Sequence, residues 1–450
     1  MHSPRILLAA PSSGSGKTTI TCGILKVLKE RGRRVVSFKC GPDYIDPMFQ
    51  QSVLGVPSGT LDLFFCDRDL LLTLYGRNAK NADCAVVEGV MGYYDGLGAA
   101  SVEASTYRVA QTLRAPVVLI VNARGQSVSA LATLDGFLRF KPDSRIRGVI
   151  FNQMSKPVFD ALAPEVRKRG VVPIGYLPKA ADLVIESRHL GLVTPDAVDD
   201  LDARLERLAA KLQETLDFDA LEAMMREAED LAIPAECEAL NMPKTRVAVA
   251  SDEAFCFLYR DNLALLKRYG AELLFFSPLH DAAIPDGAQG LILPGGYPEL
   301  FCRALSENAS MRESVRHAIE HGMPCLAECG GFLYLHRELE DMDGTFYPMC
   351  GVLDARAVRT DTLSRFGYIT LTAQTDGAFF RQGERIRAHE FHYYESEDCG
   401  SDMTATKPQS KRSWNAVHSE GTLCMGFPHL FYESNPKPIE RFLRACAKED

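Results

Sequence analysis

Two short stretches of this sequence contain residue types whose spacing suits chemistry. The first reads Pro-Ser-Ser-Gly-Ser-Gly-Lys-Thr-Thr at 11–19 and follows an apolar run at 6–10. The second reads Glu-Cys-Gly-Gly at 328–331 and follows three apolar residues. A glycine-rich turn before a helix is typical of a phosphate-binding loop, and a cysteine at a tight strand-to-helix turn is typical of a nucleophile. We therefore expect a phosphoryl-transfer site and a thiol site in one chain.

The loop at 11–19 has the order of strand, turn, Gly-Lys-Thr and helix that a nucleotide site requires, with Pro11 where the strict pattern has glycine. Lys17 is expected to neutralise the β- and γ-phosphates, and the Thr18 hydroxyl to bind Mg²⁺. The alternative is an ordinary Gly/Ser turn. The residues predicted to bind ATP are Ser13, Gly14, Ser15, Gly16, Lys17, Thr18, Thr19 and, at the end of a later strand, Asn152, which is expected to contact the adenine edge.

Carboxylates follow two other apolar runs of this half. Asp43 and Asp46 share one loop, and Glu88 ends the next run along the chain. We predict that Thr18, Glu88 and Asp43 bind Mg²⁺, and that Asp43 and Asp46 are catalytic residues that position metal or a substrate carboxylate. The alternative is that both aspartates cap turns and that Asn152 begins a loop.

The thiol site is built around Cys329. Glycines directly after it permit a tight turn that presents the side chain, and a helix N-terminus there is expected to lower the pKa of the thiol. Gly295 and Gly296, at the end of another apolar run, are predicted to supply oxyanion-hole N–H groups. The predicted base is His429, near the end of the sequence. The alternative for Cys329 is a small buried apolar residue.

The elements that must position these residues follow from hydrophobic periodicity. Short apolar runs alternate with helical stretches, which is typical of parallel sheets covered by helices, with ligands at the carboxyl ends of the strands. We predict strands at 6–10, 33–39, 84–88, 117–121, 146–152, 246–250, 271–277 and 290–293, and helices at 20–31 and 257–269.

The chain is expected to divide into two α/β domains. Between 195 and 243 the composition becomes charged, with leucines at near-helical spacing, which indicates an amphipathic linker. We predict domains at 1–195 and 244–450, joined by a helical linker at 196–243.

Composition restricts the classes of function. The net charge of −9 argues against general binding of nucleic acid or anionic membranes. No apolar run is long enough to cross a bilayer, so a cytoplasmic protein is expected. Thirteen cysteines without a Cys-x-x-Cys pair indicate neither a disulfide framework nor a zinc site.

Three runs in the first half resemble the cobyrinate a,c-diamide synthases of cobalamin biosynthesis: 41–47, 87–96 and 187–192. More broadly, this half is similar to the dethiobiotin synthetase-like ATPases. The second half resembles the class I glutamine amidotransferases, and specifically the corrin and sirohydrochlorin amidases, at 251–257, 276–279, 294–299 and 389–393. The resemblance implies a P-loop doubly wound parallel sheet followed by a flavodoxin-like class I amidotransferase α/β domain.

The implied reaction is amidation of two carboxylates of cobyrinic acid, with ATP, Mg²⁺ and L-glutamine, through a phosphorylated carboxylate. Alternatives with the same chemistry are hydrogenobyrinate and nickel-sirohydrochlorin as substrates, and cobyric acid synthase is a further relative. An alternative of another class is a partitioning-type ATPase switch with a non-catalytic amidotransferase-like module. The lysine that those ATPases carry in the loop is replaced here by Ser12.

The resemblance leaves the third member of the amidotransferase triad open. Phe431 stands where classical members have the glutamate that orients the base, and Glu433 and Glu395 are the candidates to replace it. His389 and His392 are either substrate contacts or hydrogen-bonded residues of a strand.

Overall fold

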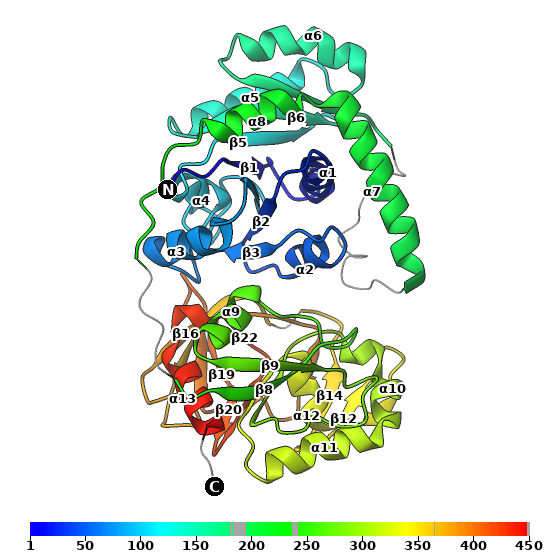
Figure 1. Ribbon diagram of the computed structural model, residues 1–450, viewed down its shortest axis with the longest axis vertical. Helices are drawn as coiled ribbons and strands as arrows, with labels where there is room; N and C mark the ends of the chain where they lie inside the picture. The colour runs from blue at the N-terminus through cyan, green and yellow to red at the C-terminus, as the bar shows by residue number, and fades with distance from the viewer. Residues whose placement is uncertain (181–182, 184–194, 236–241, 364, 448–450) are drawn as a thin grey trace. The chain divides into compact units, whose positions relative to one another are not determined.

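The computed structural model describes residues 1–180, 183, 195–235, 242–363 and 365–447. It divides into two compact units, Met1–Glu236 and Cys237–Asp450. Figure 1 shows the elements of each unit. Within the described residues, no helix has both the length and the hydrophobicity that a bilayer span requires. The run at 187–192, one of those that carried the resemblance, lies outside the described residues.

The first unit contains a seven-stranded sheet in the order β3-β2-β4-β1-β5-β6-β7. All neighbouring strands are parallel, so every strand ends at the same edge of the sheet. Its strands are β1 (Arg5–Ala9), β2 (Val35–Cys40), β3 (Ser58–Leu61), β4 (Cys84–Glu88), β5 (Val117–Asn122), β6 (Ile146–Asn152) and β7 (Val172–Leu177). Its helices are α1 (Lys17–Glu30), α2 (Ile45–Ser52), α3 (Arg68–Ala79), α4 (Thr106–Thr112), α5 (Ser129–Phe140), α6 (Lys156–Arg167), α7 (Pro195–Thr215) and α8 (Phe218–Arg226).

The structure differs from the predicted linker at 196–243. Helices α7 and α8 belong to the first unit, and α7 lies along α1 (Figure 1). Leu208 and Leu212 are fully buried, and a Cβ on Gly23 of α1 would lie only 2.3 Å from Leu212 Cδ1. The leucine periodicity therefore marks a helix that completes a core, because an apolar stripe at helical spacing must be buried against another element.

The second unit contains a six-stranded sheet and two smaller sheets. The large sheet has the order β20-β21-β11-β10-β8-β9 and is parallel except for β20. Its strands are β8 (Thr245–Ala250), β9 (Ala271–Phe276), β10 (Gly290–Leu293), β11 (Cys325–Glu328), β20 (His418–Glu420) and β21 (Leu423–Gly426). The helical segments are α9 (Arg260–Arg268), η3 (Pro298–Leu300), α10 (Cys302–Glu307), α11 (Ala309–Glu320), α12 (Gly330–Leu335), η4 (Tyr432–Ser434) and α13 (Lys437–Cys446).

The two smaller sheets contain the remaining strands of this unit, including the strand that carries His429. One has the order β13-β12-β14-β17 and the other β19-β18-β15-β16-β22. Their strands are β12 (His336–Glu340), β13 (Phe346–Pro348), β14 (Leu353–Arg359), β15 (Arg365–Ala373), β16 (Arg385–His392), β17 (Tyr394–Ser396), β18 (Met403–Thr406), β19 (Ser413–Ala416) and β22 (His429–Leu430). The first of these sheets is mixed, because β12 and β14 are parallel, and the second is antiparallel. Neither sheet was predicted, whereas the two α/β units were predicted and are confirmed.

Candidate active site

The phosphate loop lies between β1 and α1, as predicted. Gly14 and Gly16 have φ angles of 74° and 92°, a region that favours glycine. A Cβ on Gly16 would lie 2.2 Å from Asn152 Nδ2, which donates a hydrogen bond of 2.9 Å to the Ser15 carbonyl. The end of β6 is therefore fixed directly against the loop, and only glycine fits at position 16. Recognition of adenine by Asn152 stays a prediction.

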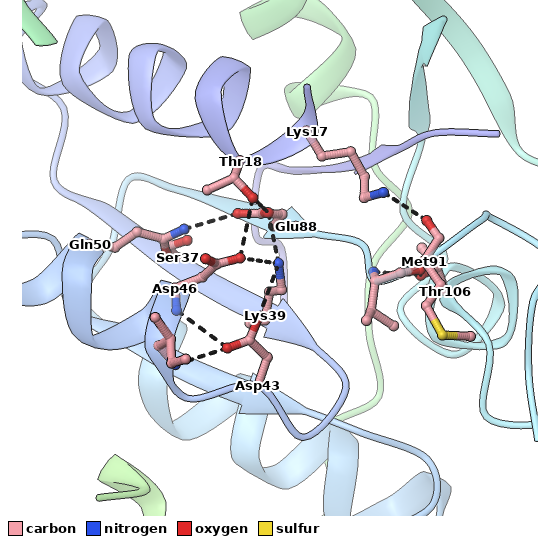
Figure 2. A network of polar contacts seen from close by, with 12 residues as sticks. Lys17, Thr18, Ser37, Lys39, Asp43, Asp46, Gln50, Glu88, Met91 and Thr106 are labelled. Carbon is pink, nitrogen blue, oxygen red and sulfur yellow. Dashed lines mark hydrogen bonds and ion pairs between the residues drawn. The ribbon is translucent and has the colours of Figure 1, made fainter. Parts of the chain in front are cut away.

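Lys17 begins α1 with its ammonium group turned toward backbone carbonyls. Its Nζ donates to the carbonyl of Met91 at 2.7 Å (Figure 2). It also donates to the carbonyl of Ser12 at 3.2 Å. Burial, followed by repulsion from Lys39, lowers the pKa of Lys17 to about 8. An anionic phosphate would favour the charged form, since opposite charges stabilise each other more strongly away from water.

Thr18 and Asp46, in the first turns of α1 and α2, meet Glu88 at the carboxyl end of β4. Thr18 Oγ1 donates to Glu88 Oε1 at 2.8 Å and lies 3.3 Å from Asp46 Oδ2 (Figure 2). Gln50 of α2 donates to the other Glu88 oxygen at 3.1 Å. The hydroxyl and the two carboxylates form a compact group of oxygen atoms beside the loop.

Asp43 has a different position from Asp46. Its Oδ1 accepts hydrogen bonds from the backbone N–H groups of Ile45 at 2.9 Å and Asp46 at 3.4 Å, so it caps the start of α2. Burial and the Asp46 carboxylate raise the pKa of Asp43. Helix capping by Asp43 agrees with the alternative stated from the sequence, that the aspartates cap turns. A metal-binding or catalytic role for Asp43 stays a prediction.

Lys39, the residue before the last of β2, is a functional candidate that sequence reasoning did not assign. Its buried ammonium pairs with Asp46, with Glu88 at 2.7 Å and with Asp43 at 3.9 Å. Burial opposes its charge, but the carboxylates outweigh burial and raise the pKa of Lys39. Burial raises the pKa of Glu88 to about 7 although Lys39 opposes that shift. The sequence feature that could have identified Lys39 is its place near the end of a buried strand, a few residues before two aspartates.

The tight strand-to-helix turn that was predicted at Cys329 is present, and its role as a nucleophile stays a prediction. Cys329 follows β11, has φ 46° and ψ −101°, and precedes α12. Its N–H donates to the Gly426 carbonyl at 2.8 Å. A Cβ on Gly331 would lie 2.1 Å from the Leu293 carbonyl, so glycine is required for the close approach of β10. A positive φ at a cysteine is the strained geometry of a nucleophile turn.

The expected lowering of the Cys329 pKa is wrong. Burial and the neighbouring Glu299 carboxylate raise the pKa of this thiol well above its ordinary value. The helix that begins at Cys329 has only six residues, and the Cys329 side chain is buried. Desolvation therefore outweighs the helix N-terminus, and the thiol at rest holds its proton.

Gly295 and Gly296 lie against the two predicted catalytic residues. A Cβ on Gly295 would lie 2.3 Å from His429 Cε1, so the imidazole packs on this glycine. A Cβ on Gly330 would lie 2.8 Å from the Gly296 nitrogen, which places that N–H beside the nucleophile turn. Within the described residues the Gly296 N–H donates no hydrogen bond. The geometry suits an oxyanion donor.

His429 lies on the short strand β22, opposite His389 of β16. Burial, followed by His389 and His392, lowers the pKa of His429 to about 3. The imidazole is therefore neutral at physiological pH and can accept a proton. His392 Nε2 lies 2.9 Å from Glu390 Oε1, and the His392 ring stacks on Phe427 at 3.9 Å, so this histidine is a bonded residue of the strand.

The candidates for a third triad member pair with arginines. Glu433 lies 3.3 Å from Arg268, and Glu395 lies 3.3 Å from Arg365. Phe431 packs edge-on against Tyr259 at 5.7 Å. Neither glutamate is assigned a catalytic role on this geometry.

The chain matches known families in both units. Residues 6–216 match the CobQ/CobB/MinD/ParA nucleotide binding domain, and residues 246–428 match the CobB/CobQ-like glutamine amidotransferase domain. Three similar proteins are named cobyrinate a,c-diamide synthase. The protein of Caldanaerobacter subterraneus is 37% identical over 98% of both chains. The protein of Listeria innocua is 39% identical over 96% of this chain and 97% of its own length. The protein of Listeria monocytogenes serovar 1/2a is 40% identical over 99% of this chain and 100% of its own length.

Proposed function

The chain belongs to the family of cobyrinate a,c-diamide synthases, which are glutamine-hydrolysing ligases, and from that premise we propose that it amidates the a and c side-chain carboxylates of cobyrinic acid. ATP and L-glutamine are the proposed co-substrates. The observation that carries the proposal is that one chain holds a phosphate loop beside buried carboxylates and, in its other unit, a strained cysteine turn and a buried neutral histidine that both lie against Gly295 and Gly296.

The first unit would activate the carboxylate. A carboxylate is a poor acceptor for ammonia because its leaving group would be oxide. Transfer of the γ-phosphoryl group of ATP to the carboxylate gives an acyl phosphate, from which ammonia displaces phosphate. Lys17 would stabilise the charge of the phosphoryl group, because its ammonium donates hydrogen bonds to the carbonyl oxygens of Ser12 and Met91 beside the loop.

Magnesium fits the oxygen atoms beside the loop. Thr18, Asp46 and Glu88 offer one hydroxyl and two carboxylates, and Mg²⁺ prefers one or two carboxylates together with phosphate oxygens and water. Within the described residues there is no group of three or more His, Cys, Asp or Glu side chains that would hold a metal alone. These three residues would hold the ion, and it would neutralise phosphate charge. In this proposal Asp46 takes the role of magnesium ligand that was predicted for Asp43 from the sequence.

The second unit would release ammonia from glutamine. Cys329 transfers its proton to His429 as its sulfur attacks the amide carbon, and the oxyanion is stabilised by the Gly296 N–H. His429 then gives the proton to the departing nitrogen, so that ammonia leaves and a thioester remains. His429 then takes a proton from water as the water oxygen attacks the thioester, the C–S bond breaks, and the proton passes from His429 to the departing Cys329 sulfur, which releases glutamate. A neutral imidazole is required at the start, and burial keeps the resting His429 neutral. Its pKa of about 3 makes it a weak base, so the developing imidazolium must be stabilised as the thiol loses its proton.

The test of this proposal separates the two nitrogen sources. Cys329→Ser should abolish amidation of cobyrinic acid with glutamine and leave amidation with an ammonium salt intact. Cys399→Ser is the matched control, because Cys399 is a half-buried cysteine that contacts Ser396 and Glu395. Loss of activity with both nitrogen sources in Cys329→Ser, or unchanged activity with glutamine, would contradict the proposal.

A further inference from the structure

Three glutamate side chains interact electrostatically with the Cys329 thiol: Glu299, Glu328 and Glu390. Two of them are bonded to neighbours. Glu390 pairs with His392, and Glu328 is hydrogen-bonded to the Tyr432 hydroxyl and the Leu430 N–H. Glu299 differs, because within the described residues its carboxylate has no ion-pair partner and is hydrogen-bonded only to its own backbone N–H.

The position of Glu299 is set by the oxyanion turn. Glu299 lies on η3, which begins two residues after Gly296. A Cβ on Gly330, the residue after the nucleophile, would lie 3.0 Å from Pro298 Cδ, so η3 packs directly on the elbow. One short segment therefore holds both the oxyanion donors and this carboxylate beside Cys329.

Among the described residues, no cation forms an ion pair or a hydrogen bond with the Glu299 carboxylate. The titratable groups that interact with it are the thiols of Cys256, Cys302 and Cys329 and the phenol of Tyr394, which are all neutral at physiological pH. Burial raises the pKa of Glu299 to about 7. Glu299 is half-buried, and a half-buried carboxylate without a cation beside it would bind a cationic ligand with a gain in free energy.

We propose that Glu299 binds the α-ammonium group of glutamine and thereby selects an α-amino acid at the thiol site. The inference rests on the proposed function, and it assigns the residue that recognises the α-amino end of glutamine, opposite the side-chain amide. Glutamine carries one cationic group, and it lies a short side chain away from the carbon that Cys329 attacks. Amidation with free ammonium does not use this site and should not need Glu299.

The first test is Glu299→Gln, which keeps the shape of the side chain and removes its charge. The ratio kcat/KM for glutamine should fall about 10- to 150-fold, mainly through KM, because a hydrogen bond to a charged group is lost. Amidation with an ammonium salt should be unchanged. Glu307→Gln, at the exposed end of α10, is the control and should leave both activities unchanged. An unchanged KM for glutamine would overturn the assignment, and so would an equal loss with ammonium.

The second test uses a substrate without the ammonium group. 4-Carbamoylbutanoate has the amide and the carboxylate of glutamine and lacks the α-amino group. The unaltered protein should hydrolyse it with a kcat/KM about 10- to 150-fold below that for glutamine, and Glu299→Gln should bring the two values close together. This convergence would not arise from a general loss of structure. If Glu299→Gln kept the full preference for glutamine, the proposal would be refuted.

Discussion

The contact between the phosphate loop and Asn152 gives the sharpest prediction of the structure. Gly14 and Gly16 both have positive φ, yet their surroundings differ. No atom lies within 4 Å of a Cβ built on Gly14, whereas a Cβ on Gly16 meets Asn152 Nδ2 at 2.2 Å. Alanine at either position strains the backbone, and alanine at position 16 also displaces the Asn152 amide.

The two alanine variants should therefore differ in ATP affinity. A left-handed backbone costs a non-glycine residue about 1–2 kcal/mol, which we expect for Gly14→Ala and which corresponds to about a 5- to 30-fold higher Kd. Gly16→Ala also breaks the hydrogen bond of 2.9 Å between Asn152 and Ser15, and this loss costs about 1 kcal/mol more. Its total of about 2–3 kcal/mol corresponds to about a 30- to 150-fold higher Kd.

The assay is equilibrium binding of ATP to each variant and to combinations with Asn152→Ala. Alanine at position 152 removes the atoms that a Cβ on residue 16 would meet. Because Asn152 is also predicted to contact adenine, Asn152→Ala alone is the reference, and Gly16→Ala should weaken ATP binding less when added to Asn152→Ala than when made in the unaltered chain. Equal affinities of the Gly14 and Gly16 variants, or additive losses in the double variant, would refute the reasoning.

Three further outcomes follow from the buried charges. Glu88→Gln should impair amidation with glutamine and with ammonium alike, and unchanged turnover with ammonium would argue against its role at the loop. Lys39→Met should lower the free energy of unfolding of the first unit, measured without nucleotide, by about 3–5 kcal/mol, because Asp46 and Glu88 lose their buried cation. The control Lys168→Met replaces an exposed lysine and should change the same free energy by under about 1 kcal/mol. Alkylation of Cys329 by iodoacetamide should accelerate with pH up to about 10 without a plateau, because its raised pKa keeps the thiolate fraction small; a plateau near pH 7 would contradict that direction.

Much of the fold was predictable because the buried strands are nearly continuous apolar runs. β4 and β6 match the predicted strands at 84–88 and 146–152. β3 was missed, since Ser-Gly-Thr-Leu at 58–61 has no apolar run and is paired only through its backbone to β2. The helical leucines of α7 were recognised, but sequence periodicity does not show against which unit a helix packs.

The site was predictable where backbone geometry decides, and less so where charges share a buried space. Gly16 and Cys329 could be identified because the turns they form need particular residues. Asp43 and Asp46 are equivalent in the sequence, and only the start of α2 separates the capping residue from the one beside Thr18. The raised pKa of Cys329 depends on burial in the folded unit and on Glu299, neither of which the order of residues reveals.

The most direct measurement of the central claim is mass spectrometry of the corrinoid after incubation of the protein with cobyrinic acid, ATP, Mg²⁺ and glutamine. The account predicts two successive conversions of carboxylate to amide, both lost when ATP is left out. Hydrolysis of glutamine without any change in cobyrinic acid would contradict the proposed substrate, and hydrogenobyrinate and nickel-sirohydrochlorin would then be tested in its place.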